Sequence, residues 1–161
     1  EYREDFIKIN DNLLVKPCFA PYENCKDLII NAINESVGEI NFATYAFTHK
    51  DIIESILKKE AYQNTKVLGV IDARGVTSTT INYQLIDWVK VNIGKRRIHT
   101  KLFRLGEELS ITGSMNPTTS GIQLNNENIL LIKSKEVSKK YENFIKNYAI
   151  QDYGIGGKSY Y

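Results

Sequence analysis

The sequence predicts an α/β domain with a mixed, mostly parallel central sheet and helices on both faces. In the first half of the chain, strand-like runs alternate with amphipathic helical patterns, which is typical of strand–helix–strand units. Residues 40–47 and 66–73 are apolar on both faces of a strand, as expected where helices cover both sides. In the second half, three strand-like runs follow one another with short connections, which makes the sheet mixed.

Length and composition are those of one soluble globular domain. The 161 residues are 42% hydrophobic and 25% charged, and no apolar run approaches the roughly 20 residues that a membrane-spanning helix needs. We expect a single domain over residues 1–161, with 1–12 and 152–161 peripheral. The net charge of +2 excludes a polycation, so any affinity for nucleic acid must come from a local patch.

The first predicted strand, Leu13–Phe19, is ended by Pro21, and Asn24 or Cys25 then opens a helix. The apolar residues of this helix form one stripe: Leu28, Ile29, Ala32, Ile33 and Val37. Gly38 stands where the glycine at the C-terminus of a helix is expected.

The middle of the chain continues the alternation of strands and helices. Strands are expected over 40–47 and 66–73, with a helix over about 50–61 between them. A third helix is expected over about 79–91. Its inward residues share one helical face: Ile81, Leu85, Trp88 and Val89.

The last third of the chain is predicted to hold three strands and a helix. The strands cover 96–105, 109–112 and 128–133, and the helix covers 135–149. The helix is expected to turn four residues inward: Val137, Tyr141, Phe144 and Tyr148.

One histidine and four polar residues predict an anion site beside a nucleophile or base. His99 and Lys101 lie two residues apart, so on a strand both side chains point to the same face. Ser114 and Asn116 follow in the loop GSMNPTTSG, and Glu127 lies beyond it. This loop is too rich in small polar residues to be core, and a polar loop between buried strands is where reactive groups are usually displayed.

Each of these residues has an ordinary structural explanation when it is taken singly. A lone histidine on a strand is more often a hydrogen-bonded structural residue, and a strand lysine is usually solvated. Serine and asparagine are favoured in turns, and a single glutamate is often a surface charge. The functional interpretation depends on the five residue types occurring together at fixed spacing.

The same residues carry a resemblance to a known family. The pattern H-x-K at 99–101, G-S-x-N at 113–116 and the downstream Glu127 resemble the single-motif branch of the phospholipase D superfamily, in particular the small Nuc-type endonucleases. The resemblance extends over most of the chain and includes the segments NFATYAFT and VIDARG. One position departs from the family pattern, because the motif's aspartate falls at Gly106.

The resemblance implies the phospholipase D/nuclease fold and a phosphodiesterase that needs no metal or other cofactor. In that chemistry, His99 attacks phosphorus and forms a covalent phosphohistidine, which water resolves. Lys101, Ser114 and Asn116 would supply positive charge and hydrogen-bond donors to the phosphate oxygens. Glu127 would orient the imidazole and stabilise its charged form.

This chemistry needs a second group that protonates the departing oxygen and then activates water. The other histidine, His49, lies far from the motif in sequence, and we expect it to be a surface residue. Larger relatives carry two motif copies in one chain, whereas this chain carries one. We therefore expect a homodimer in which two His99 residues face each other across a twofold axis.

Gly106 is most simply a hairpin residue in the turn LGEEL, where glycine suits a positive φ. In the family, the aspartate at this position usually supports structure, and the tyrosyl-DNA phosphodiesterase relatives work without it. Glu107 or Glu108 could replace it, but a carboxylate one residue further along lies on another face. We expect activity to be reduced or retained, not absent.

Charged residues near the motif are further candidates. Lys95, Arg96 and Arg97 are predicted to contact substrate phosphates, and an ordinary solvated edge is the alternative. On a strand their side chains alternate faces, so at most two could serve the site together. Asp72 and Arg74 follow a buried strand, where they could contact substrate or form an ion pair that stabilises the turn.

The chain has two cysteines, Cys18 and Cys25, without further Cys or His nearby to complete a zinc site. Their segment resembles one in many exported Nuc-like proteins, which implies a disulfide between the first strand and the first helix. Two unrelated thiols are the alternative. A bonded pair favours an extracytoplasmic or periplasmic location, and unpaired thiols favour the cytoplasm.

The sequence thus favours a metal-independent endonuclease that acts as a homodimer on single- or double-stranded DNA or RNA. A phospholipase acting on membrane phospholipids is one alternative, although we find no convincing amphipathic anchor. A catalytically weakened nucleic-acid-binding protein is the other, because of Gly106.

Overall fold

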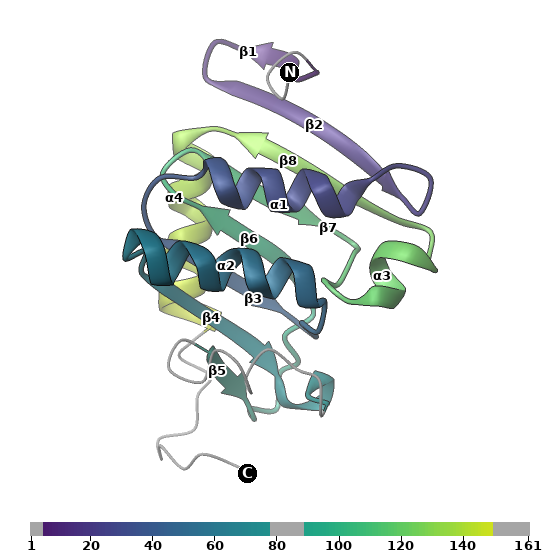
Figure 1. Cartoon of the computed structure of the whole chain (residues 1–161). Helices are drawn as coiled ribbons and strands as arrows, with labels where there is room; N and C mark the ends of the chain where they lie inside the picture. Colours follow the sequence, from purple (N-terminus) through teal and green to yellow (C-terminus); the bar gives the residue numbers. More distant parts are fainter. Residues whose placement is uncertain (1–4, 78–88, 150–161) are drawn as a thin grey trace.

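The computed structural model describes residues 5–77 and 89–149, and its centre is one eight-stranded sheet (Figure 1). The strands lie in the order β1-β2-β8-β7-β6-β3-β4-β5. Their bounds are β1 Ile7–Asn10, β2 Leu13–Ala20, β3 Ile40–Thr44, β4 Val67–Asp72, β5 Val89–Asn92, β6 Lys101–Leu105, β7 Leu109–Gly113 and β8 Glu127–Lys133.

The sheet is mixed, as predicted, but the prediction that it is mostly parallel is wrong. Among the described strands, only β3–β4 and β4–β5 pair in parallel. The pairs β1–β2, β2–β8, β8–β7, β7–β6 and β6–β3 are antiparallel. β2 and β3 follow each other along the chain but are not neighbours in the sheet. Instead, β2 lies on the other side of the sheet and pairs with β8 from Leu14 opposite Lys133 to Ala20 opposite Glu127.

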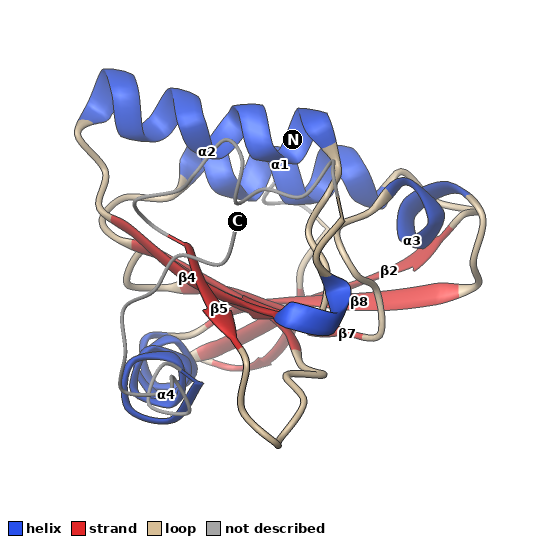
Figure 2. Cartoon of the chain, turned by 90° about the horizontal axis from the view of Figure 1, so that it is seen from below, coloured by secondary structure: helices blue, strands red, loops and turns tan. Residues whose placement is uncertain are grey.

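Helices cover both faces of the sheet, as predicted (Figure 2). On one face, α1 (Cys25–Glu35) and α2 (Lys50–Gln63) lie side by side. On the other face lies α4 (Lys135–Phe144), which a π-helical turn, Ile145–Ala149, continues. Two short elements lie in loops: a 3-10 turn, Ala73–Gly75, and α3, Thr119–Gln123.

The start of α1 agrees with the sequence, and its end does not. The Asn24 side chain accepts a hydrogen bond from the backbone N–H of Asp27, so Asn24 is the N-cap. The helix ends at Glu35, and Ser36 follows it in an extended conformation. Gly38 therefore does not end the helix; with a φ of 106°, it shapes the turn into β3.

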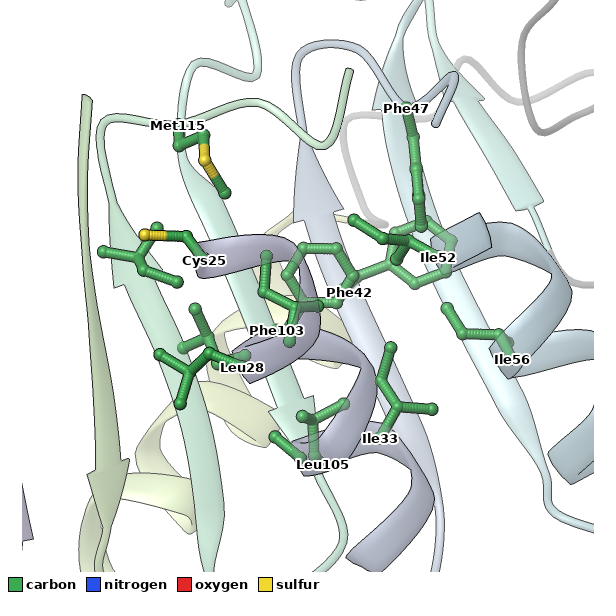
Figure 3. Close-up of a cluster of buried hydrophobic side chains, with 14 of the residues drawn as sticks. Cys25, Leu28, Ile33, Phe42, Phe47, Ile52, Ile56, Phe103, Leu105 and Met115 are labelled. Carbon is green, nitrogen blue, oxygen red and sulfur yellow. The ribbon is translucent and has the colours of Figure 1, made fainter. Parts of the chain in front are cut away.

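Three phenylalanines form the centre of the core between the sheet and helices α1 and α2 (Figure 3). The ring centroid of Phe47 lies 5.2 Å from that of Phe42 and 5.5 Å from that of Phe103, edge-on in both cases. On the opposite face of the sheet, Ala43 belongs to a second buried cluster together with Ile145. β3 is thus buried on both faces, as its apolar run predicted.

Parts of two predicted helices are wrong. Residues 78–88 lie outside the described residues, but 89–91, the predicted end of the third helix, belong to β5. Val89 and Val91 alternate with polar residues, as expected of a strand. This strand pairs with β4. In α4, Ser138 is fully buried, whereas Val137 is half-buried. Ser138 turns inward because its hydroxyl donates to the carbonyl of Gly106.

Three strand boundaries also differ from the sequence prediction. The strand predicted over 40–47 ends at Thr44, so residues 45–47 lie in a loop. The strand predicted over 96–105 begins only at Lys101, so the preceding residues form a loop. Residues 7–10, expected to be a loosely docked lead-in, form the edge strand β1, which pairs with β2. Ile7 and Ile9 alternate with Lys8 and Asn10, which is the period of a strand, although all four side chains are exposed.

Candidate active site

The five candidate catalytic residues lie at or next to one edge of the sheet, where β3 and β7 end and β6 and β8 begin. Figure 1 shows how these four strands are arranged. β3 ends where β6 begins, because the two strands are antiparallel and pair Thr44 with Lys101. β7 ends where β8 begins, since Gly113 pairs with Ile129. This edge therefore collects loops that are far apart in the sequence.

His99 and Lys101 are brought together by a hydrogen bond rather than by a shared strand face. His99 is exposed and lies in the loop before β6, so the prediction that it lies on a strand is wrong. Lys101 begins β6 and is only 8% exposed. Its ammonium donates to the carbonyl oxygen of His99 over 2.7 Å. Burial lowers the pKa of Lys101, and the nearby charge of Glu127 acts in the opposite direction.

Ser114 and Glu127 form a pair across the β7–β8 edge. The Ser114 hydroxyl donates to Oε2 of Glu127 over 2.5 Å and accepts from the backbone N–H of Asn128 over 3.0 Å. The side chain of Asn125 donates to Oε1 over 3.1 Å. Both carboxylate oxygens thus have partners. Within the described residues, no hydrogen bond joins Glu127 to the imidazole of His99, so its predicted orienting role stays a prediction.

Asn116 is tied to the end of β3. The Thr44 hydroxyl can donate its one proton to Oδ1 of Asn116, 3.4 Å away, or to the carbonyl oxygen of Ala46, 3.3 Å away. Nδ2 of Asn116 is the end of the amide that can donate to an anion. Thr44 in turn pairs with Lys101 in the sheet. A chain of contacts therefore joins the candidate residues. Thr44 connects Asn116 to Lys101, and the charge of Glu127 acts on Lys101, which is bonded to the backbone of His99.

A buried carboxylate holds the loop that carries His99. Asp72, at the end of β4, is fully buried and accepts from the backbone N–H of Ile98 over 2.7 Å. It also accepts two bonds from one guanidinium nitrogen of Arg74, at 2.9 and 2.8 Å. The side chain of Asn92 lies 3.4 Å from the same carboxylate. Of the two possibilities for Asp72 and Arg74, the structure has the ion pair, and this pair braces the residue just before His99.

The predicted basic patch is exposed, but it does not lie on a strand. Lys95, Arg96 and Arg97 are all exposed in the loop between β5 and β6, so the expected alternation of faces does not apply. The guanidinium of Arg97 lies over the ring of Tyr45, 5.5 Å from its centroid. All three cations therefore lie in the loop that leads into His99.

Tyr45 is a site residue that the sequence reasoning missed. Its ring centroid lies 6.2 Å from that of His99, and its hydroxyl donates to the carbonyl of Arg74 over 3.0 Å. The sequence prediction placed Tyr45 inside a strand over 40–47, whereas β3 ends at Thr44 and Tyr45 begins the loop, where α/β folds display binding groups.

His49 is buried, so the prediction of a surface residue is wrong. It is 7% exposed and stands at the N-cap of α2. Its backbone N–H and that of Thr48 both donate to the carbonyl of Pro117, in the same loop as Asn116. Among the described residues its Nδ1 has no hydrogen-bond partner, and burial lowers the pKa of the ring. The apolar core around Phe47, two residues earlier, pulls this position inward.

Gly106 lies at the opposite edge of the sheet from His99. β6 runs from Lys101 to Leu105, so Gly106 is about 16 Å from Lys101 along the strand direction. Its φ is 69°, and a Cβ built there would lie 2.2 Å from the carbonyl oxygen of Val37. The neighbouring Glu108 faces Lys133 and Lys135 at this far edge. Neither the glycine nor a shifted glutamate can contribute a group to the candidate site.

Cys18 and Cys25 form a disulfide that joins the end of β2 to the start of α1. The implied pairing is therefore confirmed. Among the residues that the structure describes, no three His, Cys, Asp or Glu side chains are grouped so as to hold a metal ion. None of the described helices is long and apolar enough to span a bilayer.

Fold and site together define a phospholipase D-like domain. The family model described as "Cardiolipin synthase, PLD-like domain" matches residues 29–149, which include all five candidate catalytic residues. The chain belongs to this family, and the resemblance drawn from its sequence motifs is confirmed.

Relatives and solved structures agree with this assignment. The chain is 23% identical over 131 residues to a protein named phospholipase D from Rickettsia felis. This match covers 79% of the chain and 65% of the relative, so the chain spans just under two thirds of that relative's length.

Two solved structures share the fold. NucT from Helicobacter pylori has a TM-score of 0.74 at 19% identity, over 87% of this chain and 97% of NucT. Nuc from Salmonella typhimurium, described as a phospholipase D family member, has a TM-score of 0.71 at 22% identity, over 81% of this chain and 90% of Nuc. The predicted phospholipase D/nuclease fold is thereby confirmed.

Proposed function

We propose that this protein is a phosphodiesterase that cleaves nucleic acid internally, without a metal, through a covalent phosphohistidine. The observation that carries the proposal is the gathering of His99, Lys101, Asn116 and the Ser114–Glu127 pair at one edge of the sheet. A phosphodiester resists attack until its charge is offset. This edge offers an exposed imidazole beside a buried ammonium, which suits that requirement.

In the proposed reaction, a ring nitrogen of His99 forms a bond to phosphorus while the bond from phosphorus to the leaving oxygen breaks. Lys101 and Asn116 donate to the non-bridging oxygens, where negative charge develops. A proton donor then gives its proton to the leaving oxygen. Finally, a water molecule attacks the phosphohistidine and breaks the N–P bond, which restores the imidazole.

The proton donor in this scheme is the His99 of a second subunit. The other histidine of the chain, His49, is buried at the start of α2 and is poorly placed for a proton transfer to substrate. A twofold axis beside the active edge would place two copies of His99 and Lys101 around one phosphate. The proposed enzyme is therefore a homodimer with one shared site.

The exposed basic loop favours nucleic acid as the substrate class. Lys95, Arg96 and Arg97 directly precede His99 and can contact phosphates on either side of the one being cleaved. Phospholipid hydrolysis is the second candidate function, because the Rickettsia relatives are named phospholipase D. The remote position of Gly106 argues against the third possibility, a catalytically silent nucleic-acid-binding protein.

The disulfide supports a proposed compartment. Disulfides persist in oxidising surroundings and are rare in the cytosol of most cells. The bond between Cys18 and Cys25 therefore favours an extracytoplasmic location, such as a periplasm.

The test is incubation of the purified protein, in EDTA, with labelled single- and double-stranded DNA and RNA and, separately, with phospholipid vesicles. We expect cleavage of nucleic acid and intact vesicles, with no cleavage by His99→Ala. Vesicle hydrolysis without nucleic-acid cleavage would support the phospholipase instead. Binding of nucleic acid without cleavage would support the silent protein, and cleavage that returns only on adding Mg²⁺ would contradict the metal-free reaction.

A further inference from the structure

Tyr45 presents an aromatic ring beside the candidate nucleophile. It is half-buried and directly follows Thr44, whose strand partner is Lys101. Its ring centroid lies 6.2 Å from that of His99, with 56° between the ring planes. Its hydroxyl donates to the carbonyl oxygen of Arg74 over 3.0 Å. The ring is therefore held at both ends, by the end of β3 and by the turn after β4.

Arg97 places a second planar group next to this ring. Its guanidinium carbon lies 5.5 Å from the centroid of Tyr45, and Arg97 is exposed. Both groups stand in the loops around His99, yet neither takes part in the bond-making steps described above. A flat aromatic ring and a flat guanidinium are the two kinds of side chain on which unpaired nucleobases stack.

We propose that Tyr45 and Arg97 form a stacking platform for the nucleobase next to the scissile phosphate, so that the substrate is single-stranded nucleic acid. This inference rests on the proposed function and names its substrate class. The Tyr45 ring lies 6.2 Å from the imidazole of His99, and the base and the phosphate of one nucleotide are attached to the same sugar. A base on the platform therefore leaves its own phosphate near the imidazole.

The platform discriminates among the substrates considered above. In a duplex, each base is stacked and paired inside the helix, so it reaches the platform only after unpairing. A phospholipid headgroup has no aromatic plane and gains nothing from Tyr45. A single strand offers an unpaired base next to every phosphodiester, and stacking is tolerant of base identity.

The experiment compares two single-stranded oligonucleotides with the same phosphates, one carrying normal bases and one with abasic residues flanking a single cleavable phosphodiester. For the wild-type protein, we expect kcat/KM to be about ten-fold higher on the strand with bases, mainly through KM. In Tyr45→Leu we expect the ratio of the two kcat/KM values to fall to about one. In the matched variant Tyr45→Phe, which keeps the ring, we expect the ratio to stay as in the wild type. Arg97→Lys keeps the charge but removes the plane, so it lowers the preference as well.

Binding provides a readout that does not depend on cleavage. We measure the affinity of His99→Ala protein, alone and combined with Tyr45→Leu, for both oligonucleotides by fluorescence anisotropy. Tyr45-dependent binding of the strand with bases, without cleavage by the wild type, would overturn the proposed reaction and keep the platform. Equal affinity for both strands, or an equal loss on both in Tyr45→Leu, would overturn the platform and leave Tyr45 as a support for the His99 loop. If thermal melting shows that Tyr45→Leu does not fold, Arg97→Lys carries the same comparison.

Discussion

At the scale of single residues, His99 and Lys101 divide the proposed chemistry between an exposed group and a buried one. The exposed imidazole can reach a phosphorus atom, whereas the buried ammonium has lost hydration and acts more strongly on an anion. Lys101 is held by the backbone carbonyl of His99, not by its side chain. The imidazole can therefore be removed without releasing the lysine.

The first prediction concerns His99→Ala. Losing the nucleophile should lower kcat by several orders of magnitude, as in other covalent mechanisms. The fold should remain intact, because the side chain is exposed. Cleavage of a labelled single strand measures the first effect and thermal melting the second. Unchanged turnover in a fully folded variant would remove His99 from the mechanism.

The second prediction concerns Gly106→Asp, which restores the residue that the family pattern has at this position. A positive φ of 69° and the close carbonyl of Val37 leave no room for a side chain. We expect the free energy of unfolding to fall by at least about 1–3 kcal/mol, with little change in the kcat of the protein that remains folded. Glu107→Asp, in the same turn but exposed, is the control. A more stable or more active Gly106→Asp protein would show that the turn adapts.

At the scale of elements, the sequence predicted those whose residues repeat with a clear period. The strand Glu127–Lys133, the beginning of the strand Ile40–Thr44 and the start of α1 follow from apolar runs and an N-cap. The loop before His99 was not predicted, because its sequence resembles that of a strand. The hydrogen bonds that hold it as a loop come from Asp72 and Asn92, which belong to other elements. Motif spacing predicted a common site without its geometry, since contacts such as that of Thr44 with Asn116 join residues distant in sequence.

The third prediction tests this brace through Asp72→Asn. The amide keeps the size of the side chain but removes the charge that binds Arg74. We expect kcat to fall about ten-fold with KM nearly unchanged, because the loop would present His99 in more than one position. Stability should fall by about 1–3 kcal/mol, measured by urea unfolding. A loss of stability with an unaltered kcat would mean that Asp72 supports the fold alone.

The fourth prediction is an acid sensitivity at the start of α2. Burial lowers the pKa of His49, while Asp51 opposes this effect and Lys26 adds to it. Near and below the ordinary histidine pKa of about 6.5, the unfolded chain thus binds more protons than the folded one, so stability falls as the pH falls through that value. In His49→Gln this part of the pH dependence should disappear. Melting temperatures of both proteins between about pH 5 and 8 give the comparison, and parallel curves would exclude His49 as the cause.

At the scale of the whole molecule, the candidate catalytic residues lie at one edge of the sheet, where β3 and β7 end. The long antiparallel pairing of β2 with β8 lies on the side of the sheet away from the parallel strands. An edge with one copy of the motif is half of the proposed site. Its completion therefore depends on association between copies of the chain, and catalysis should follow the statistics of that association.

The fifth prediction follows from this dependence. When wild-type and His99→Ala subunits are mixed in equal amounts and allowed to exchange, activity should fall to about half that of the wild-type component, and with a ninefold excess of the variant to about a tenth. The same mixture assayed before exchange is the control. Activity that stays constant after exchange, or sedimentation of a fully active monomer, would contradict a shared site.

The pairing of β2 with β8 has a consequence for the order in which the protein can become active during synthesis. β2 is made early, but its only partner beyond β1, among the described strands, is β8, which starts at Glu127. Until the ribosome has released that segment, β2 lacks its main neighbour and Ser114 lacks its carboxylate. A nascent chain that has been made only as far as β7 thus contains His99 but lacks β8 and Glu127, so the proposed active site is incomplete. The proposed cutting of nucleic acid can therefore begin only after the chain has been made beyond β8.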